Sequence, residues 1–182
     1  AGAAQGGLFW ELDDDAWRYA GEMLARIDEI IADYGMTQAL HPHLRTIVET
    51  AADVEHVLSV SDVGWTLDTG HLLIGGCDPL QFVRDHRDRI RHVHLKDVHL
   101  GIAAPVLAGD RSIMEGVQDG MFCNLGDGDV AIAEIVHELE RGSYDGWYVL
   151  EQDAAITGDL PPVGSGPIVD VAASIDFLRT VD

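Results

Sequence analysis

Hydrophobic and polar positions follow two different spacings along the chain. Short apolar runs that end in polar residues predict β-strands, and longer stretches with an apolar residue at every third or fourth position predict amphipathic helices. The predicted strands cover residues 38–43, 63–68, 90–96 and 146–151. The predicted helices lie within residues 13–35, 45–60, 75–90, 129–142 and 169–180. Four strands and five helices in strict alternation are typical of an α/β fold with a parallel sheet.

Polar residues mark the beginnings of the predicted helices. Thr50 and Asp53 have the spacing of a capping box, in which each side chain accepts a hydrogen bond from the other residue's backbone N–H. Asp78 followed by Pro79 is a second start signal, because proline tolerates the first helical position. Asp129 is the expected cap of the helix that ends at residue 142.

One stretch, residues 98–128, interrupts this regular pattern. It is rich in glycine and ends in the sequence FCNLGDGD. Connections of this length in compact domains are usually functional lids or disordered segments. We therefore expect an irregular loop that hangs over the end of the sheet.

A potential metal ligand stands at the end of each predicted strand. These residues are His41, Asp68, His94 and Glu151. The carboxyl ends of parallel strands meet at one end of a barrel, so the four side chains are expected to converge. Two imidazoles and two carboxylates suit one Mn²⁺, Co²⁺, Fe²⁺ or Zn²⁺ ion, and Mg²⁺ is less favoured. Taken singly, Asp68 is equally explained as a cap of the following turn and His41 as an ordinary hydrogen-bonded histidine.

The net charge of the chain limits the classes of molecule that it is expected to bind. The 182 residues include 32 acidic and 11 basic side chains, which gives a formal net charge of −21. Such a field repels polyanions, so nucleic-acid binding is not expected. The acidity itself is typical of a strongly solvated surface, as in adaptation to high salt. Lys96 is the one lysine of the chain, and it lies within a predicted strand end.

The cysteines and the hydropathy of the chain indicate in which cellular compartment the protein is expected. Cys77 and Cys123 lie far apart and have no metal-binding spacing, so a disulfide framework is not expected. The start AGAAQGGLFWELDDD lacks the basic flank and apolar core of a signal peptide, and no apolar run is long enough for a membrane span. These features predict a cytoplasmic protein without membrane contact.

Five motifs in order resemble the xylose isomerase-like, or sugar phosphate isomerase/epimerase, superfamily, which also contains inosose dehydratase and endonuclease IV. The motifs are HPHLRTIVET, LDTGHLLIGGCDP, DRIRHVHLKDV, FCNLGDGDV and SYDGWYVLEQD. The resemblance implies a (β/α)₈ TIM barrel. The chain, residues 1–182, is then a single partial domain that holds the carboxyl-terminal half of the barrel, with about four strands and five helices.

The resemblance also implies roles for individual residues. Asp68, His94 and Glu151 match the positions of family metal ligands. The fourth ligand is usually Glu in epimerases, and this chain has His41 there, with Glu49 nearby as the alternative. Arg45 stands where relatives with a similar block often have Gly, which is expected to change substrate fit.

The leading hypothesis is a metal-dependent isomerase or epimerase that acts on a sugar or polyol ketone through an enediolate intermediate. Glu151 is the candidate base, and Glu49 or His43 handles the second proton. Lys96 is expected to hold a substrate oxygen. The substrate contacts are expected from His43, His71, Lys96 and Arg45.

Three alternatives stay open at this stage. An inosose dehydratase-type lyase would use the same site and expel a β-hydroxyl group. A barrel fragment without activity would act as an assembly module, and either a homo-oligomer or a missing amino-terminal half-barrel is the expected partner. An abasic-site endonuclease needs a basic groove for phosphates, and the net charge of −21 argues against it.

Overall fold

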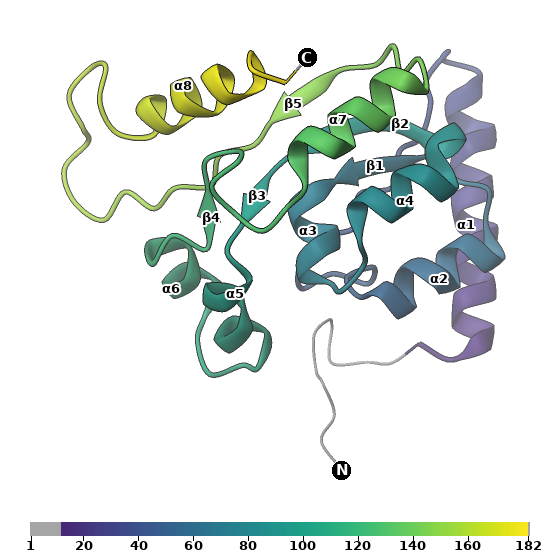
Figure 1. The fold of residues 1–182 in the computed structure, drawn as a ribbon. Coiled ribbons are helices and arrows are strands. Elements are labelled where there is room, and N and C mark those ends of the chain that lie inside the picture. The colour runs from purple at the N-terminus through teal and green to yellow at the C-terminus, as the bar shows by residue number, and fades with distance from the viewer. Residues whose placement is uncertain (1–11, 182) are drawn as a thin grey trace.

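The computed structural model describes residues 12–181. Parallel strands lie at the centre and helices flank them, as Figure 1 shows. Residues 1–11, which belong to the segment that lacks the features of a signal peptide, lie outside the described residues. Within residues 12–181, no helix is both long enough and apolar enough to cross a membrane.

The central sheet of the described chain has three parallel strands in the order β1, β2, β5. They are β1 (Trp65–Asp68), β2 (Ile90–Leu95) and β5 (Tyr148–Leu150). In this register Asp68 lies beside His94, and His94 lies beside Val149. The carboxyl ends of β1, β2 and β5 therefore lie together at one side of the molecule.

The predicted strand at residues 38–43 is mostly wrong. Only Leu40 pairs with the sheet, in an isolated parallel bridge to Trp65. The Leu40 N–H donates to Gly64 O at 2.7 Å, and the Thr66 N–H donates to Leu40 O at 2.8 Å. Pro42 has no N–H to extend this ladder, and the His43 N–H donates to Val48 O within a turn. The bridge still places this segment next to β1.

Most of the predicted helices form close to their expected positions. They are α1 (Asp14–Ala32), α2 (Ala51–Val60), α4 (Pro79–His86) with a following 3₁₀ turn (Arg87–Arg89), α7 (Ile132–Arg141) and α8 (Pro167–Leu178). The Thr50–Asp53 capping box is present at the start of α2, and the Asp78 side chain caps α4. A short helix that the pattern did not predict, α3 (Thr69–Ile74), follows β1 directly.

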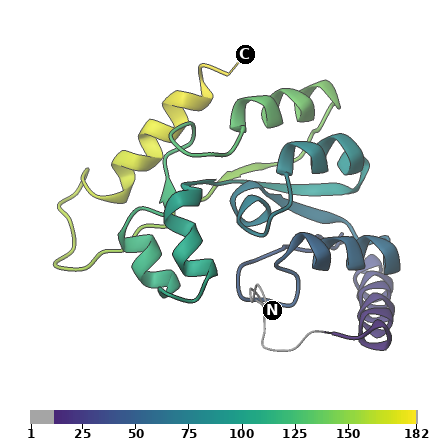
Figure 2. The same ribbon diagram turned by 60° about the horizontal axis from the view of Figure 1, so that its bottom comes forward.

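The expectation of an irregular stretch at residues 98–128 is wrong. It contains α5 (Leu100–Leu107), α6 (Ile113–Gln118) and an antiparallel pair of short strands, β3 (Asp97–Val98) and β4 (Phe122–Cys123). Both helices bury small or apolar residues, including Ala103, Val106 and Gly116. Figure 2 shows α5 and α6 well apart from α1 and α2.

Asp129 does not cap α7 as the sequence predicted. Its carboxylate accepts a 2.7 Å hydrogen bond from the Leu100 N–H at the start of α5. The residue before α7 is Ala131, which offers no side-chain cap. Asp129 therefore caps the helix that lies near it in space rather than the one that follows it in sequence.

The core lies between the sheet and the helices that cover it. Trp65, Leu67, Val93 and Leu95 of the strands are fully buried. Helices α4 and α7 lie side by side over one face of the sheet (Figure 1) and contribute buried side chains such as Val83 and Ile135. This packing fixes the strand ends on which the polar side chains stand.

Candidate metal centre

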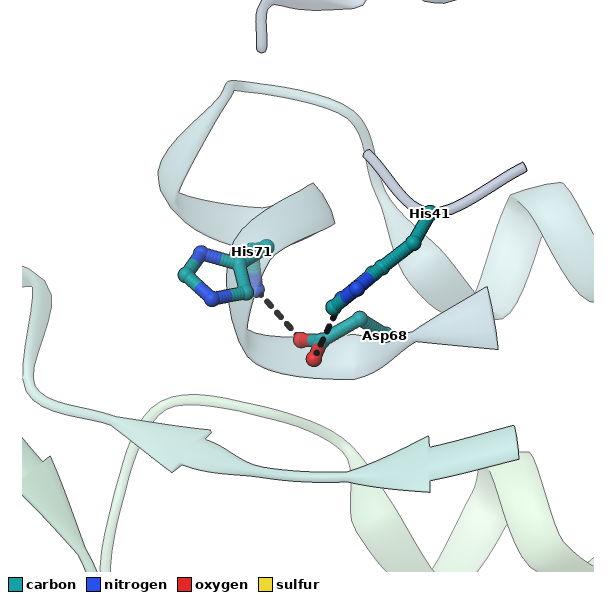
Figure 3. A group of neighbouring side chains, drawn as sticks. All are labelled: His41, Asp68 and His71. Carbon is teal, nitrogen blue, oxygen red and sulfur yellow. Dashed lines mark hydrogen bonds and ion pairs between the residues drawn. The ribbon is translucent and has the colours of Figure 1, made fainter. Parts of the chain in front are cut away.

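Asp68 lies at the junction of β1 and α3, and its carboxylate serves both elements. One oxygen, Oδ1, accepts a 2.8 Å hydrogen bond from the His71 N–H and so caps α3. The other, Oδ2, lies 3.2 Å from His41 Nε2 and 3.5 Å from His94 Nδ1. Asp68 therefore caps the turn that follows β1, and its second oxygen faces His94 and also His41, whose contact with Asp68 is drawn in Figure 3.

Two neighbouring strands bring His94 and Glu151 to the same point. The Glu151 N–H donates to Leu95 O at 3.1 Å, which holds Glu151 at the end of β5 beside β2. Glu151 Oε1 then lies 3.0 Å from His94 Nδ1. This nitrogen is buried, yet within the described chain no group meets it with hydrogen-bond geometry.

Two overlapping groups of possible metal ligands result within residues 12–181. One contains Asp68, His94 and Glu151, and the other contains His41, Asp68 and His71. In each group the candidate ligand atoms lie within 4.8 Å of one another. Asp68 belongs to both, so each of the four residues that the sequence proposed as ligands lies in one group or the other, and neither group of the described residues holds all four.

The separations between these atoms fit a small divalent ion. Bonds of about 2.1 Å to nitrogen and oxygen ligands place neighbouring ligand atoms about 3.0 Å apart in an octahedron and about 3.4 Å apart in a tetrahedron. The contacts of 3.0 and 3.2 Å fall in that range, and the contact of 3.5 Å lies just above it. The buried His94 nitrogen without a hydrogen bond is the kind of atom that a metal ion would satisfy.

His71 is oriented differently from His41. In Figure 3 the His41 ring points at the Asp68 carboxylate, whereas the His71 ring points away and only its backbone N–H faces Asp68. The His71 Nε2 atom lies 3.2 Å from Lys96 Nζ. Burial, helped by nearby positive groups including Lys96, lowers the pKa of His71 to about 3. A neutral His71 accepts a hydrogen bond from the Lys96 ammonium in the tautomer that carries its proton on Nδ1, and in the other tautomer Nδ1 accepts instead from the Leu44 N–H at 3.4 Å.

Lys96 is buried among acceptors just beyond the end of β2. Its Nζ atom lies 2.8 Å from Glu151 Oε2 and 2.9 Å from Asp153 Oδ2, and only 2% of the residue is exposed. Burial alone would lower the pKa of Lys96, but the negative charges of Asp68, Glu151 and Asp153 outweigh it and raise the pKa. The site therefore holds a permanent positive charge.

Burial and nearby charges also act against each other on the pKa values of the candidate ligands. Burial by itself would raise the pKa of Asp68, but the contacts with the imidazoles of His41 and His94 hold that pKa far below its usual range. The interaction with Asp68 in turn raises the pKa of His94, against the effect of burial. Asp68 is thus a carboxylate at neutral pH, as a metal ligand must be.

Of three further predicted residues, His43 lies beside this cluster, whereas Arg45 and Glu49 make other contacts. The His43 ring is 5.5 Å from the His41 ring and 3.9 Å from the His71 ring, centre to centre. The Arg45 guanidinium donates to Val106 O at 3.2 Å and so reaches α5. Glu49 is only 3% exposed, and it belongs to neither ligand group among the described residues.

A pocket of about 300 Å³ adjoins the cluster on the side of α6. Its polar lining comes from His43, His71 and Asp153. Its apolar lining comes from Leu44, Ile113, Met114, Val117, Phe122, Ala154 and Ala155. The sequence analysis missed the contributions of Asp153 and α6. The signal for Asp153 was its spacing of two from Glu151, which places both residues on one side of an extended chain.

Comparisons with known proteins agree with this architecture. A family model described as xylose isomerase-like TIM barrel matches residues 2–181. The rhizopine catabolism protein MocC of Rhizobium meliloti is 37% identical over 144 residues, which cover 78% of this chain and 44% of that protein. The inosose dehydratase of Lacticaseibacillus casei is 34% identical over 143 residues, which cover 77% and 48% respectively. The chain spans about half the length of these relatives.

Solved structures at lower identity show the same fold. The probable 3-DHS dehydratase AsbF from Bacillus anthracis superposes with a TM-score of 0.71 at 19% identity and covers 94% of this chain, while this chain covers 60% of it. An L-ribulose 3-epimerase gives a TM-score of 0.65 at 19% identity, with coverages of 96% and 57%. The described strands and helices match part of such a barrel. The chain therefore belongs to the xylose isomerase-like TIM barrel family, as its ordered motifs predicted.

Proposed function

We propose that this chain carries the catalytic face of a metal-dependent enzyme that removes a proton beside the carbonyl group of a sugar or polyol ketone. The observation that carries the proposal is the series of contacts of 3.0–3.5 Å that joins His41 to Asp68, Asp68 to His94, and His94 to Glu151. A buried lysine stands beside this cluster and supplies a fixed positive charge. The relatives named inosose dehydratase support a polyol-type substrate.

The metal ligands in this proposal are His41, Asp68, His94 and Glu151. This set of nitrogen and oxygen donors suits Mn²⁺, Co²⁺ or Zn²⁺, with Mg²⁺ as a weaker possibility. His41 is preferred to Glu49 as the fourth ligand because its Nε2 atom faces Asp68 at 3.2 Å. A bound divalent ion would act as a Lewis acid that makes the carbon beside a carbonyl more acidic.

Lys96 has the position to hold a substrate oxygen. Its ammonium is held by Glu151, Asp153 and His71 at 2.8–3.2 Å, and it lies 4.9 Å from the centre of the Phe122 ring. A fixed positive charge in a buried site stabilises developing negative charge on oxygen without reorganisation. Asp153 is half exposed, so it is the acceptor that a substrate oxygen would replace most easily.

His43 is the strongest candidate for proton removal. Its Nδ1 atom donates to Leu44 O at 2.8 Å in the tautomer that makes this hydrogen bond, which leaves Nε2 as an acceptor. His43 is exposed and lines the pocket. Glu151 has both oxygens engaged, by His94 and Lys96, so acting as the base would cost one of these contacts.

Glu49 remains the candidate for the second proton transfer. Burial raises the pKa of its carboxyl group, although the nearby Arg45 acts in the opposite direction. A carboxyl group with a raised pKa can carry a proton at a pH where an ordinary glutamate is ionised. Arg45, which reaches the backbone of Val106, and His71 complete the proposed substrate-contacting set.

Three outcomes share the same first step. Returning the proton to the neighbouring carbon gives isomerisation, and returning it to the opposite face gives epimerisation. Expelling a β-hydroxyl group gives dehydration, which the curated relatives named inosose dehydratase favour. Exchange of the substrate α-proton for deuterium in D₂O, followed by NMR, tests the common step. The identity of the product then selects the outcome, and no exchange with ketoses or inososes would refute the proposal.

Metal binding has a sharper test that needs no substrate. The Asp68→Asn variant is compared with Asp78→Asn, because both aspartates cap helices and only Asp68 lies in the cluster. After loading with Mn²⁺ or Zn²⁺ and desalting, elemental analysis should find about one ion per chain in the wild type and in Asp78→Asn. Asp68→Asn should retain almost none. Full retention by that variant would contradict the ligand assignment.

A second candidate function, an assembly module, is favoured by one observation on α1. An apolar stripe at helical spacing is exposed there, formed by Tyr19, Met23, Ile27 and Ile30, and Tyr34 in the following turn is also exposed. Patches of this kind often mark association surfaces. Sedimentation velocity tests the idea, since a self-associating chain should become monomeric in the Ile27→Glu, Ile30→Glu double variant. A wild type that stays monomeric at all concentrations would remove this candidate.

A further inference from the structure

We infer that Thr69 and Gly70, the first two residues of α3, position Lys96 and thereby determine where its ammonium lies in the site. The inference rests on the proposed function for the role of Lys96, but the positioning itself is a property of the chain. Neither residue belongs to the proposed ligands or proton carriers.

Thr69 binds the backbone of Lys96 in both directions. The Lys96 N–H donates to the Thr69 hydroxyl oxygen at 2.9 Å, and that hydroxyl donates to Lys96 O at 2.7 Å. Strand β2 ends at Leu95, so the backbone of Lys96 lies just beyond the strand and needs other partners. Thr69 is fully buried, and its hydroxyl satisfies both groups without water.

Gly70 provides the space that the lysine side chain occupies. A Cβ atom at this position would lie 2.7 Å from Cγ, 3.0 Å from Cδ and 3.1 Å from Cβ of Lys96. The Cβ and Cγ atoms are close to the backbone and cannot swing aside as the end of a flexible side chain could. Gly70 lies in helix α3, so the requirement is for space rather than for an unusual backbone conformation.

The two adjacent residues act on different parts of Lys96, Thr69 on its backbone and Gly70 on its side chain. Thr69 holds the backbone of Lys96 in place. Gly70 lets the methylene groups of the Lys96 side chain pass close to the first turn of α3. The ammonium then arrives between Glu151 and Asp153 and beside His71. In the segment Asp68–His71, Asp68 is thus a proposed metal ligand and Thr69 binds the backbone of Lys96. Gly70 leaves space for the Lys96 side chain, and the His71 ring lies beside the Lys96 ammonium.

Because Lys96 is the one lysine of the chain, it can be observed without interference. Protein labelled with ¹⁵N-lysine should give one side-chain ammonium resonance, with slow proton exchange because the group is buried and hydrogen-bonded. The test compares Thr69→Val, which lacks the hydroxyl, with Thr69→Ser, which keeps it. It also compares Gly70→Ala with Gly101→Ala, because no atom lies within 4 Å of a Cβ at Gly101.

We expect Thr69→Val and Gly70→Ala to shift the ammonium resonance and to speed its exchange with water. Acetylation of Lys96 by an amine reagent, followed by mass spectrometry, should accelerate by about tenfold, as expected when roughly one hydrogen bond is lost. Thr69→Ser and Gly101→Ala should behave as the wild type. Metal content should be unchanged in all four variants, because Asp68 keeps its place.

An unchanged ammonium signal in folded Gly70→Ala and Thr69→Val would overturn the inference. If Gly70→Ala does not fold, the comparison of Thr69→Val with Thr69→Ser decides alone. Failure of the proposed function would look different. The spectra would then change as expected, while wild-type protein would show no α-proton exchange on any ketone.

Discussion

Asp97 shows how one buried carboxylate can organise a loop. Its oxygens accept hydrogen bonds of 2.8–3.0 Å from the backbone N–H groups of Val98, Gly126, Gly128 and Val130. The side chain is fully buried. A Cβ atom at Gly128 would lie 2.3 Å from Asp97 Oδ1, so glycine is needed for this approach. One side chain therefore accepts three of the hydrogen bonds that hold the loop before α7.

Replacing this carboxylate should be costly. In Asp97→Asn an amide NH₂ faces backbone donors, so two of the four hydrogen bonds are lost in a buried site. The free energy of unfolding should fall by about 3 kcal/mol, since hydrogen bonds to charged groups contribute roughly 1.5–3 kcal/mol each. Urea denaturation measures the change, and the exposed Asp88→Asn serves as the control. Equal stability of both variants would contradict the anchoring role.

His71 makes stability depend on pH. Its folded pKa of about 3 lies below the ordinary value of 6.5, so the folded state binds fewer protons than the unfolded state between these values. The stabilisation is complete above pH 6.5 and is lost as the pH falls toward the folded pKa. The loss amounts to at most about 1.4 kcal/mol per pH unit.

The prediction is tested in metal-free protein between pH 6.5 and about 5, above the range in which most carboxylates titrate. The free energy of unfolding of the wild type should fall more steeply with acid than that of His71→Gln, by about 1 kcal/mol per pH unit. The comparison isolates His71, because His92 with its lowered pKa and His94 with its raised pKa are present in both proteins. Parallel curves would show that His71 is not buried in its neutral form.

At the scale of elements, the contact between α1 and α2 depends on a glycine. A Cβ atom at Gly21 in α1 would lie 2.4 Å from the backbone oxygen of Val60, the last residue of α2. Backbone at a helix end cannot move aside as a side chain can. The two helices therefore approach at a distance that only glycine permits.

Gly21→Ala and Gly101→Ala should have opposite effects on stability. Alanine gains up to about 1 kcal/mol of helix propensity at either position. Gly101 has open space, so its variant should be unchanged or slightly more stable. At Gly21 the overlap should cost about 1–3 kcal/mol and exceed the gain. Thermal unfolding followed by circular dichroism measures both, and a stabilised Gly21→Ala would contradict the close packing.

At the scale of the whole molecule, repulsion among the many negative side chains is the dominant electrostatic effect. A net charge of −21 on 182 residues opposes the compact state, and the surface ion pairs are mostly local contacts within helices. Salt shortens the range of the repulsion from about 10 Å at 0.1 M to about 3 Å at 1 M. Screening should therefore favour the folded chain.

Raising NaCl from about 0.1 M to about 1 M should increase the midpoint of thermal unfolding by roughly 5 °C, which corresponds to about 2 kcal/mol for a chain of this size. Differential scanning fluorimetry measures the shift. KCl at equal ionic strength is the control for a specific ion effect. A midpoint that falls with salt would mean that attractive ion pairs outweigh the net repulsion.

The sequence by itself determined the local features of this protein. Apolar spacing and caps predicted α1, α2, α4, α7 and the strands β1, β2 and β5, because these elements depend on periodicity and on neighbouring residues. Strand ends also indicated His41, Asp68, His94 and Glu151, since parallel strands present their carboxyl ends together. The family followed from the order of the motifs.

Tertiary structure alone decided the rest, because the relevant partners are distant in sequence. Asp129 caps α5 rather than α7, and Asp153 reaches Lys96 across 57 residues. Residues 98–128 fold into two helices because packing against the core stabilises elements that their glycine content disfavours. The space left by Gly70 for Lys96 depends on two strands and a helix meeting at one place. No pattern along the chain specifies how these elements lie together, because their arrangement results from tertiary packing.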